Sequence, residues 1–364
     1  MKAMKKLALL LSLVFAVTGC GGGVSVDAAE NDTQQKAVAN LDGAAILTVH
    51  YIDVGQADCA LLESDGHYMV IDGGDNGDAD TIVSYLEEQG VKKLDVVVGT
   101  HPHEDHIGSL DAVINNFDVD AVYMPKIMHT SKTFEDVLDA ISNKGLKIKA
   151  PNPGDTFYFN GLEVEVLGPQ QEYSDFNNNS IVLKVTAGET KFLFTGDAEA
   201  LAEEDILNAG HDVQADVLKV GHHGSSTSSS QEFLQAVSPD FAVISVGTGN
   251  SYGHPEEETL DRLESMGVEI YRTDLQGTII CSTDGKNITF NAVSTNAGGE
   301  KTETVNASVT TEAEPAEIFI GNKNSKKFHK EDCASLPVEK NRVTLESREE
   351  AIALGYEPCG SCNP

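Results

Sequence analysis

Three histidines and an aspartate are crowded into six residues of this 364-residue chain, at positions His101, His103, Asp105 and His106. Imidazole and carboxylate groups are ligands that suit zinc, manganese and iron. His101 and His103 are spaced so that both rings can face one ion, whereas Asp105 and His106 come one turn later and can face a second. This short segment therefore predicts a site for two metal ions that lie close together.

Two later segments offer further ligands of the same kinds. Asp197 follows the apolar run "FLFTG", and His222 and His223 follow "DVLKVG". The segment that begins at His101 also follows an apolar run, "LDVVVG". Because α/β sheets place their ligands at the carboxyl ends of strands, we expect all three segments to meet at one edge of a sheet.

The rest of the chain up to about residue 290 alternates apolar runs typical of strands with segments of helical periodicity. Strands are expected in residues 46–55, 59–64, 68–72, 94–99, 120–124, 162–168, 180–187, 191–196, 216–221 and 241–247. Helices are expected in residues 78–90, 133–145, 198–210 and 229–237, and from about residue 107 onward. This alternation predicts an α/β domain.

The motifs H-x-H-x-D-H, T-G-D and a late G-H, in this order, resemble those of the metallo-β-lactamase fold superfamily. The stretches "HYIDVGQADCALLE", "MVIDGGD", "NNNSIVLKV" and "LKVGHHGSSTSSS" are most similar to the hydrolase domain of the ComEC-like competence proteins, over about residues 46–290. The resemblance implies a four-layer αββα sandwich with metals at one edge. It also implies two divalent ions, zinc or manganese, held by His101, His103, Asp105, His106, Asp197 and His222.

Other residues match the family in part. Asp58 and Asp72 belong to its first motifs and are expected to support the metal loop. Many members carry a further histidine before the T-G-D motif, where this chain reads "DFNNNS" at residues 175–180. The first metal would then have a more open shell, unless His129 fills the gap.

Two adjacent metal ions lower the pKa of a shared water, which then attacks phosphorus or an acyl carbon. Asp105 is expected to orient that water, with Asp197 as the bridge, and His254 in "NSYGHPEEE" to donate a proton or to bind phosphate. Hydroxyl groups beside a helix start that matches a capping box, Ser229 to Glu232, indicate an anion site. Alternatively, these hydroxyl groups only cap the helix and bind no anion. The expected phosphate-side residues are His223, Ser225, Ser226 and Thr227.

These features favour a metal-dependent phosphodiesterase or nuclease that acts on extracellular DNA. A hydrolase of an acyl or lactam substrate is one alternative, and a non-catalytic DNA-binding lipoprotein is another. The net charge of −33 repels polyanions at long range, so a nucleic acid would have to be captured locally. No protein partner is indicated.

The first twenty residues predict export. A basic start precedes an apolar run from Leu7 to Val17, which is too short to span a bilayer of about 30 Å. The run ends "VTGC", which resembles a bacterial lipobox, so residues 1–20 are expected to be a signal peptide and Cys20 the lipidated residue. Residues 21–45 read as a flexible tether. The protein is then anchored by lipid to the outer face of the cell membrane.

The end of the chain predicts a separate module. Residues 293–316 read as a linker, and residues 317–364 form a small unit with an H-x₃-C and a C-x-x-C pattern. A structural zinc would bind His329, Cys333, Cys359 and Cys362, although an exported location also admits disulfides. The module resembles the metal-binding domain of the Ada DNA-repair protein, with histidine in place of that domain's first cysteine.

Overall fold

The computed structural model describes residues 45–296, 319–330, 333, 335–345, 351 and 356–359. Contacts divide the chain into two compact units, Met1–Gly299 and Glu300–Pro364, each of which is described by itself. The expected signal peptide with Cys20, nearly all of the tether, most of the linker, and Cys362 lie outside the described residues. In the described ranges no helix is long and apolar enough to cross a membrane.

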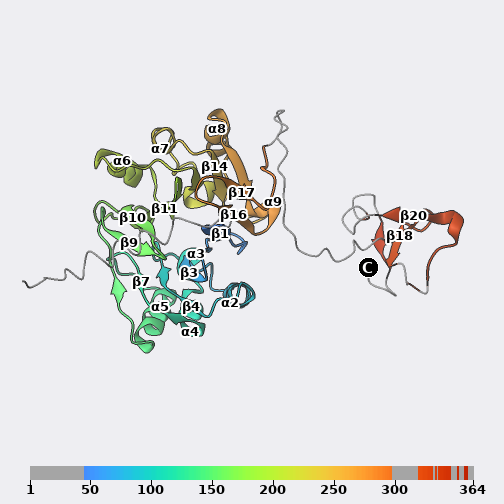
Figure 1. Cartoon of the computed structure of the whole chain (residues 1–364), viewed down its shortest axis with the longest axis horizontal. Coiled ribbons are helices and arrows are strands. Elements are labelled where there is room, and N and C mark those ends of the chain that lie inside the picture. The colour runs from blue at the N-terminus through green and yellow to red at the C-terminus, as the bar shows by residue number, and fades with distance from the viewer. Residues whose placement is uncertain are drawn as a thin grey trace, which may run out of the picture. The chain divides into compact units, whose positions relative to one another are not determined.

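The first unit contains two large β-sheets (Figure 1). The first sheet has eight strands in the order β17 (Ile288–Phe290), β16 (Ile279–Thr283), β1 (Leu47–Tyr51), β2 (Ala60–Ser64), β3 (His67–Ile71), β5 (Val96–Val98), β7 (Val122–Tyr123), β8 (Ile148–Lys149). The second has seven in the order β15 (Glu269–Arg272), β14 (Phe241–Ile244), β13 (Val217–Lys219), β12 (Thr190–Phe194), β11 (Val182–Ala187), β10 (Leu162–Gly168), β9 (Thr156–Phe159). A short ladder joins β4 (Lys93–Leu94) to β6 (Asp118–Val119).

Helices cover the outer face of each sheet, as Figure 1 shows. The first sheet carries α2 (Ala79–Glu88), α4 (Leu110–Asn116) and α5 (Lys132–Asn143). The second carries α6 (Ala200–Asn208), α7 (Gln231–Val237) and α8 (Glu257–Ser265). The remaining helical segments in residues 45–296 are α3 (Glu104–Ile107), α9 (Thr273–Gln276) and two 3₁₀ turns, η1 (Asn177–Asn179) and η2 (Gly221–Gly224). The layers are therefore αββα, and the predicted fold class is confirmed.

The alternation of side chains along the strands explains these layers. In β5, Val96 and Val98 point into the core between the two sheets, whereas Val97 points to the helix layer. In β11, Leu183 and Val185 likewise face the first sheet. Because both faces of each central strand are buried, their sequences read as nearly continuous apolar runs.

The predicted strands and helices are present in the structure, with shorter bounds for some. The expected strand at 120–124 is reduced to β7, and the helix expected from about residue 107 is divided into α3 and α4. Several elements had not been predicted, namely β8, β9, β15, β16, β17, α8 and α9.

The second unit has a four-stranded sheet in the order β20 (Arg342–Leu345), β18 (Phe319–Asn322), β19 (Lys327–Lys330), β21 (Glu357–Pro358). One 3₁₀ turn, η3 (Glu339–Asn341), precedes β20. The apolar core that the described residues of this unit form is small and includes Phe319, Phe328, Leu345 and Tyr356. A core of this size usually needs a staple such as a bound metal.

Candidate metal centre

The loop after β5 carries the first histidines, and close backbone packing fixes its shape. His103 begins α3 in an extended conformation. A Cβ added to Gly108 would lie 2.2 Å from the carbonyl carbon of Asp75, so only glycine allows these two loops to approach. The loops are further joined by Gly73 N–H, which donates to His106 O at 2.6 Å. The ligand residues therefore sit on a rigid edge of the first sheet.

Three of the predicted ligands form a first group, in which the ligand atoms of His101, His103 and Asp197 all lie within 4.8 Å of one another. His101 Nε2 is 3.0 Å from His103 Nδ1 and 3.7 Å from Asp197 Oδ2. His101 is fully buried, and burial, followed by the neighbouring His106, lowers its pKa well below the ordinary value. His101 is therefore neutral, as a metal ligand must be.

A second group consists of Asp105, His106, Asp197 and His223, again with ligand atoms within 4.8 Å of one another. His106 Nε2 lies 3.0 Å from Asp197 Oδ1. His223 Nε2 lies 3.3 Å from Asp105 Oδ2 and 3.9 Å from Asp197 Oδ1. Asp197 belongs to both groups, so it has the position expected of a bridging carboxylate.

The structure brings His223, and not His222, into the second group. Both residues lie in η2 with left-handed backbones, at φ values of 51° and 53°, and this bend turns the buried His223 inward. His222 remains partly exposed, with Nδ1 3.4 Å from Glu199 Oε1 and Nε2 3.7 Å from Asp197 Oδ2. Our expectation that His222 completes the second group is thus corrected, and His222 lies at the rim.

Asp72 contacts one of the candidate ligands and the backbone beside it. It accepts from Thr100 N–H at 2.7 Å and from Thr100 Oγ1 at 2.8 Å, and its Oδ2 lies 2.8 Å from His106 Nδ1. The second ring nitrogen of His106 is thereby directed at Asp197. Carboxylate partners of this kind commonly orient metal-binding histidines.

Asp58 contacts His223 in the same way and is itself paired with Lys219, a residue that the sequence analysis did not identify. Asp58 Oδ1 lies 3.3 Å from His223 Nδ1, which is also 3.0 Å from Ser245 O. Its other oxygen, Oδ2, is 2.9 Å from the buried Lys219 Nζ. The signal in the sequence was a lysine inside the apolar run "DVLKVG", where a charge requires a partner.

The donor atoms themselves indicate that a cation fits here. His106 Nε2, Asp197 Oδ1 and His223 Nε2 are buried and have no well-directed hydrogen bond to a described residue, although they lie close to one another and to Asp105. Buried polar atoms without well-directed hydrogen bonds are costly unless a ligand satisfies them. Oxygen and imidazole donors that converge in this way match the preferences of zinc and manganese.

Without a metal, the carboxylates hold protons on two of the histidines. Burial disfavours the His223 cation, but Asp58, Asp197 and Asp105 together outweigh burial and raise the pKa of His223 to about 10. Burial is likewise outweighed at His106 by Asp197 and Asp72, which raise its pKa well above the ordinary value. A bound metal would have to displace both protons.

The place of the missing histidine is taken by polar side chains. Ser180 Oγ accepts from Asp197 N–H at 3.0 Å and lies 3.3 Å from His101 Nδ1. Asn177 Oδ1 is buried without a hydrogen-bond partner in the described part of the chain. His129 does not fill the gap, because its Nδ1 is 2.8 Å from Ser131 Oγ and it is absent from every ligand group found among the described residues.

The loop expected to bind phosphate is occupied by the protein's own carboxylates. Ser226 donates to Glu256 through its N–H at 3.0 Å and its hydroxyl at 2.9 Å, and Ser225 Oγ is 3.3 Å from the same carboxylate. The N–H groups of Ser229 and Ser230 donate to Glu203 at 2.6 and 2.9 Å. The prediction of a free anion site at this loop is therefore wrong.

Two details of that loop also differ from expectation. The residue that caps α7 is Ser230, whose hydroxyl accepts from Phe233 N–H, and not Ser229. Thr227 Oγ1 donates to Glu199 Oε1 at 3.1 Å and lies 3.3 Å from His222 Nδ1. Through Thr227, the loop therefore holds Glu199 and His222 in place at the rim of the candidate metal centre.

A hollow of about 310 Å³ opens over the two ligand groups. His254 belongs to its wall, and its Nδ1 is buried without a hydrogen-bond partner, 3.9 Å from Glu256 Oε1. Burial, followed by His222 and His223, lowers the pKa of His254. The lining residues are Gln56, His103, Glu104, Asp105, Asn177, Asp197, His222, His223, Tyr252 and His254.

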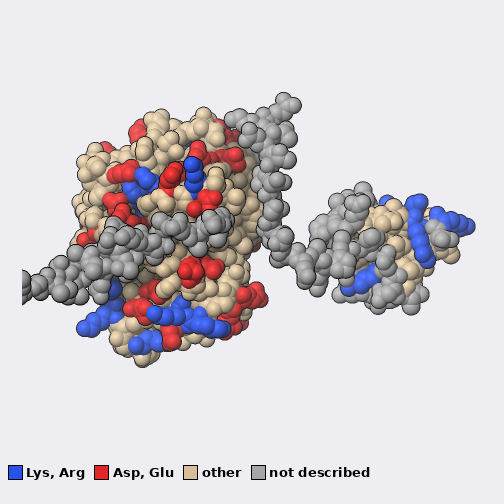
Figure 2. Space-filling view, viewed as in Figure 1, with Lys and Arg blue, Asp and Glu red and all other residues tan. Residues whose placement is uncertain are grey.

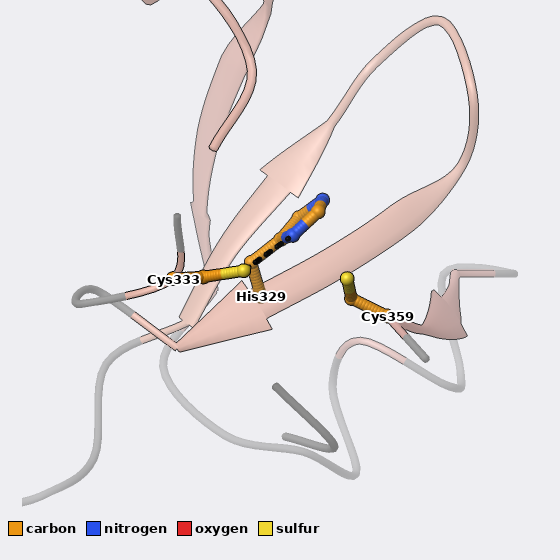
Figure 3. Close-up of side chains that lie close together, drawn as sticks. All are labelled: His329, Cys333 and Cys359. Atoms are coloured by element: carbon orange, nitrogen blue, oxygen red, sulfur yellow. Dashed lines mark hydrogen bonds between the residues drawn. The ribbon is translucent and has the colours of Figure 1, made fainter. Parts of the chain in front are cut away.

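The second unit assembles three of its four predicted ligands. His329, Cys333 and Cys359 point toward one another (Figure 3), with all three ligand atoms within 4.8 Å. His329 Nδ1 lies 3.4 Å from Cys333 Sγ, and Cys359 is held where its N–H donates to Phe328 O at 2.9 Å. The buried Cys59 and Cys281 are free thiols. The fourth predicted ligand, Cys362, lies outside the described residues.

Comparison with known proteins identifies the family. A model of the metallo-beta-lactamase superfamily matches residues 52–248, which is more than half of the chain. The chain belongs to the metallo-beta-lactamase superfamily, and part of it is similar to competence proteins.

Two relatives show the narrower similarity. ComE operon protein 3 of Bacillus subtilis (strain 168) is 35% identical over 199 residues, which cover 54% of this chain and 26% of that protein. Competence protein ComA of Neisseria gonorrhoeae is 33% identical over 230 residues, which cover 62% of this chain and 31% of that protein. The match thus spans only a quarter to a third of each relative.

A solved structure with the same fold description is the metallo-beta-lactamase fold protein YhfI from Bacillus subtilis. It is 12% identical, with a TM-score of 0.43, and the match covers 62% of this chain and 96% of that one.

Proposed function

We propose that this protein is a two-metal phosphodiesterase that cleaves DNA outside the cell. The observation that carries the proposal is the convergence beneath an open hollow of buried His106, Asp197 and His223 atoms that lack well-directed hydrogen bonds to described residues. Two relatives have names that refer to competence, ComE operon protein 3 and Competence protein ComA. Both features support a polymer of phosphodiesters as substrate.

In this proposal His101, His103 and Asp197 hold one divalent ion, zinc or manganese. Asp105, His106, Asp197 and His223 hold the other. Two ions of this kind supply a nucleophile near neutral pH and stabilise charge that develops on phosphoryl oxygens. Asn177 lines the same hollow, and its Oδ1, which is buried without a hydrogen-bond partner among the described residues, would offer a further oxygen donor.

The chain's own residues complete the reaction. The carboxylate of Asp105, whose side chain is one-third exposed, orients the attacking water. His254, which lines the same hollow, would contact the substrate phosphate and deliver a proton to the leaving oxygen. Its lowered pKa leaves it neutral in the free protein, and the negative charge of a bound phosphate then favours its protonation.

Cleavage of bis-p-nitrophenyl phosphate, compared with a lactam and a thioester, tests the proposal. The metal-loaded protein should hydrolyse the phosphodiester, and Asp197→Ala should abolish turnover because it removes the shared carboxylate. Hydrolysis of the lactam or thioester alone would mean that the substrate class is wrong. Full activity in the Asp197 variant would mean that the metal mechanism is wrong.

The proposed location is the outer face of the membrane, with Cys20 as the lipidated residue. Replacement of Cys20 with Ala should release the protein from the membrane fraction or halt its processing. An unchanged membrane pool in that variant would contradict lipid anchoring.

In the second unit we propose a structural zinc bound by His329, Cys333, Cys359 and Cys362. Burial, followed by Lys327, lowers the pKa of His329 and keeps its ring neutral for metal binding. A tetrahedral site of this composition is typical of structural zinc.

A further inference from the structure

Tyr252 is a large exposed aromatic side chain at the wall of the metal-centre hollow. It is 71% exposed, yet it lines the same hollow as Asp105 and Asp197. Its ring lies 5.9 Å from the ring of His254 with the planes only 16° apart. One face of the tyrosine is therefore stacked on the histidine, and the other face is open to solvent.

The side chain of Asn250 organises the backbone of the loop that carries Tyr252. Asn250 Oδ1 accepts from the N–H groups of Tyr252 and His254, each at 3.1 Å. Asn250 Nδ2 donates to Gly247 O at 3.0 Å and to His254 O at 2.6 Å. An exposed ring held in this way loses little conformational freedom when a ligand stacks on it.

The charge around the hollow makes such a contact necessary for a nucleic acid. Glu104, Asp105 and Asp197 line it, and acidic side chains are scattered over the face of the first unit shown in Figure 2. The net charge of the chain is −33. The acidic surface therefore does not attract the phosphates of a nucleic acid from a distance. Stacking of bases on aromatic side chains is the other general source of affinity for single strands.

We propose that Tyr252 is the stacking platform for a nucleobase beside the scissile phosphate, and that the substrate is single-stranded nucleic acid. This inference rests on the proposed phosphodiesterase function. Inside a duplex both faces of a base are covered by its neighbours, so a base that stacks on the ring must come from a single strand or a strand end. The volume of about 310 Å³ is at the lower end for small-ligand pockets and suits one nucleotide unit.

The absence of tryptophan from the chain allows a direct test. Tyr252→Trp introduces a single reporter, and Tyr158→Trp is the matched control, because Tyr158 is 50% exposed and lines a separate hollow with His67 and Asp95. Each full-length, metal-loaded variant is titrated with a phosphorothioate thymidine decamer, which resists hydrolysis. The same titration uses an abasic decamer with the same backbone.

We expect saturable quenching of Tyr252→Trp by the thymidine strand, and none by the abasic strand or in the Tyr158 control. Tyr252→Ala should bind the thymidine strand about 5- to 150-fold more weakly, with abasic binding unchanged. Equal quenching by both strands, equal quenching by a duplex, or unchanged affinity in Tyr252→Ala would overturn the inference.

A parallel cleavage assay with unmodified single-stranded DNA separates this inference from the proposed function. Cleavage without base-dependent quenching would leave the phosphodiesterase intact and remove the stacking role. Base-dependent quenching without cleavage in the wild type would keep Tyr252 as a nucleobase site and reject the proposed hydrolysis.

Discussion

Lys219 Nζ lies 2.9 Å from Asp58 Oδ2, and both side chains are buried beneath the metal centre. Asp58 in turn contacts His223. Lys219 therefore holds the carboxylate of Asp58 in place, and Asp58 in turn positions His223, a proposed ligand. Loss of either partner of a buried ion pair leaves an uncompensated charge, which typically costs about 3–5 kcal/mol.

Lys219→Met should accordingly lower the free energy of unfolding by about 3–5 kcal/mol and also weaken metal binding. Lys184→Met is the matched control, because Lys184 is equally buried and pairs with Glu165 at 3.0 Å on another part of the second sheet. Both variants should be destabilised in urea titrations. Only Lys219→Met should lose metal affinity in calorimetry; equal affinity in the two variants would remove the link between Lys219 and the centre.

The protonated state of His223 predicts how the stability of the metal-free protein depends on pH. Its pKa is raised from 6.5 to about 10 in the folded chain, so its contribution to stability is complete below about pH 6.5. The contribution is then lost as pH rises through about 10. Chemical unfolding from pH 6 to 10 should show this decline in the apoprotein and a smaller one in His223→Gln. An identical decline in the two proteins would argue against the charged His223.

His254→Ala should reduce turnover of a small phosphodiester by a factor of about 10²–10⁴, the range for loss of general acid catalysis. The metal content should be unchanged, since His254 is not in either ligand group. His67→Ala serves as the control, because the half-exposed His67 pairs with Asp95 and lines a hollow separate from that of the ligand groups. Steady-state kinetics with metal analysis decide the outcome; normal turnover in His254→Ala would exclude the proton-donor role.

Cys359→Ser should remove one equivalent of zinc and unfold the small sheet, because Cys359 supplies a thiolate and closes the strand contact at Phe328. Hydrolysis of a small phosphodiester should be unaffected, since the two units have separate cores. Metal analysis, circular dichroism and kinetics measure these effects. Simultaneous loss of hydrolysis would show that the two units act as one.

The fold was predictable because the central strands are buried on both faces and their apolar runs are unmistakable. Elements with weaker patterns were missed. Strand β8 consists of two exposed residues, and α8 buries only Thr259 and Leu263 among its nine residues. Neither presents an apolar stripe long enough to reveal its periodicity.

Residue types pointed to most members of the candidate ligand groups, but two contacts depend on geometry that spacing does not reveal. Adjacent histidines are equivalent in sequence, and the left-handed backbone at His222 and His223 decides which one turns inward. The serine loop has the composition of an anion site, but the anion is Glu256 from a distant part of the chain. Long-range contacts of this kind appear only in the folded structure.

The most direct test of the central claim is the number of metal ions bound by the purified full-length protein and by the adjacent histidine variants. We predict three equivalents of zinc in the wild type, two in the larger unit and one in the smaller. His223→Ala should lose one equivalent, whereas His222→Ala should keep all three. Fewer than one equivalent in the larger unit, measured in the Cys359→Ser background, would contradict a two-metal centre.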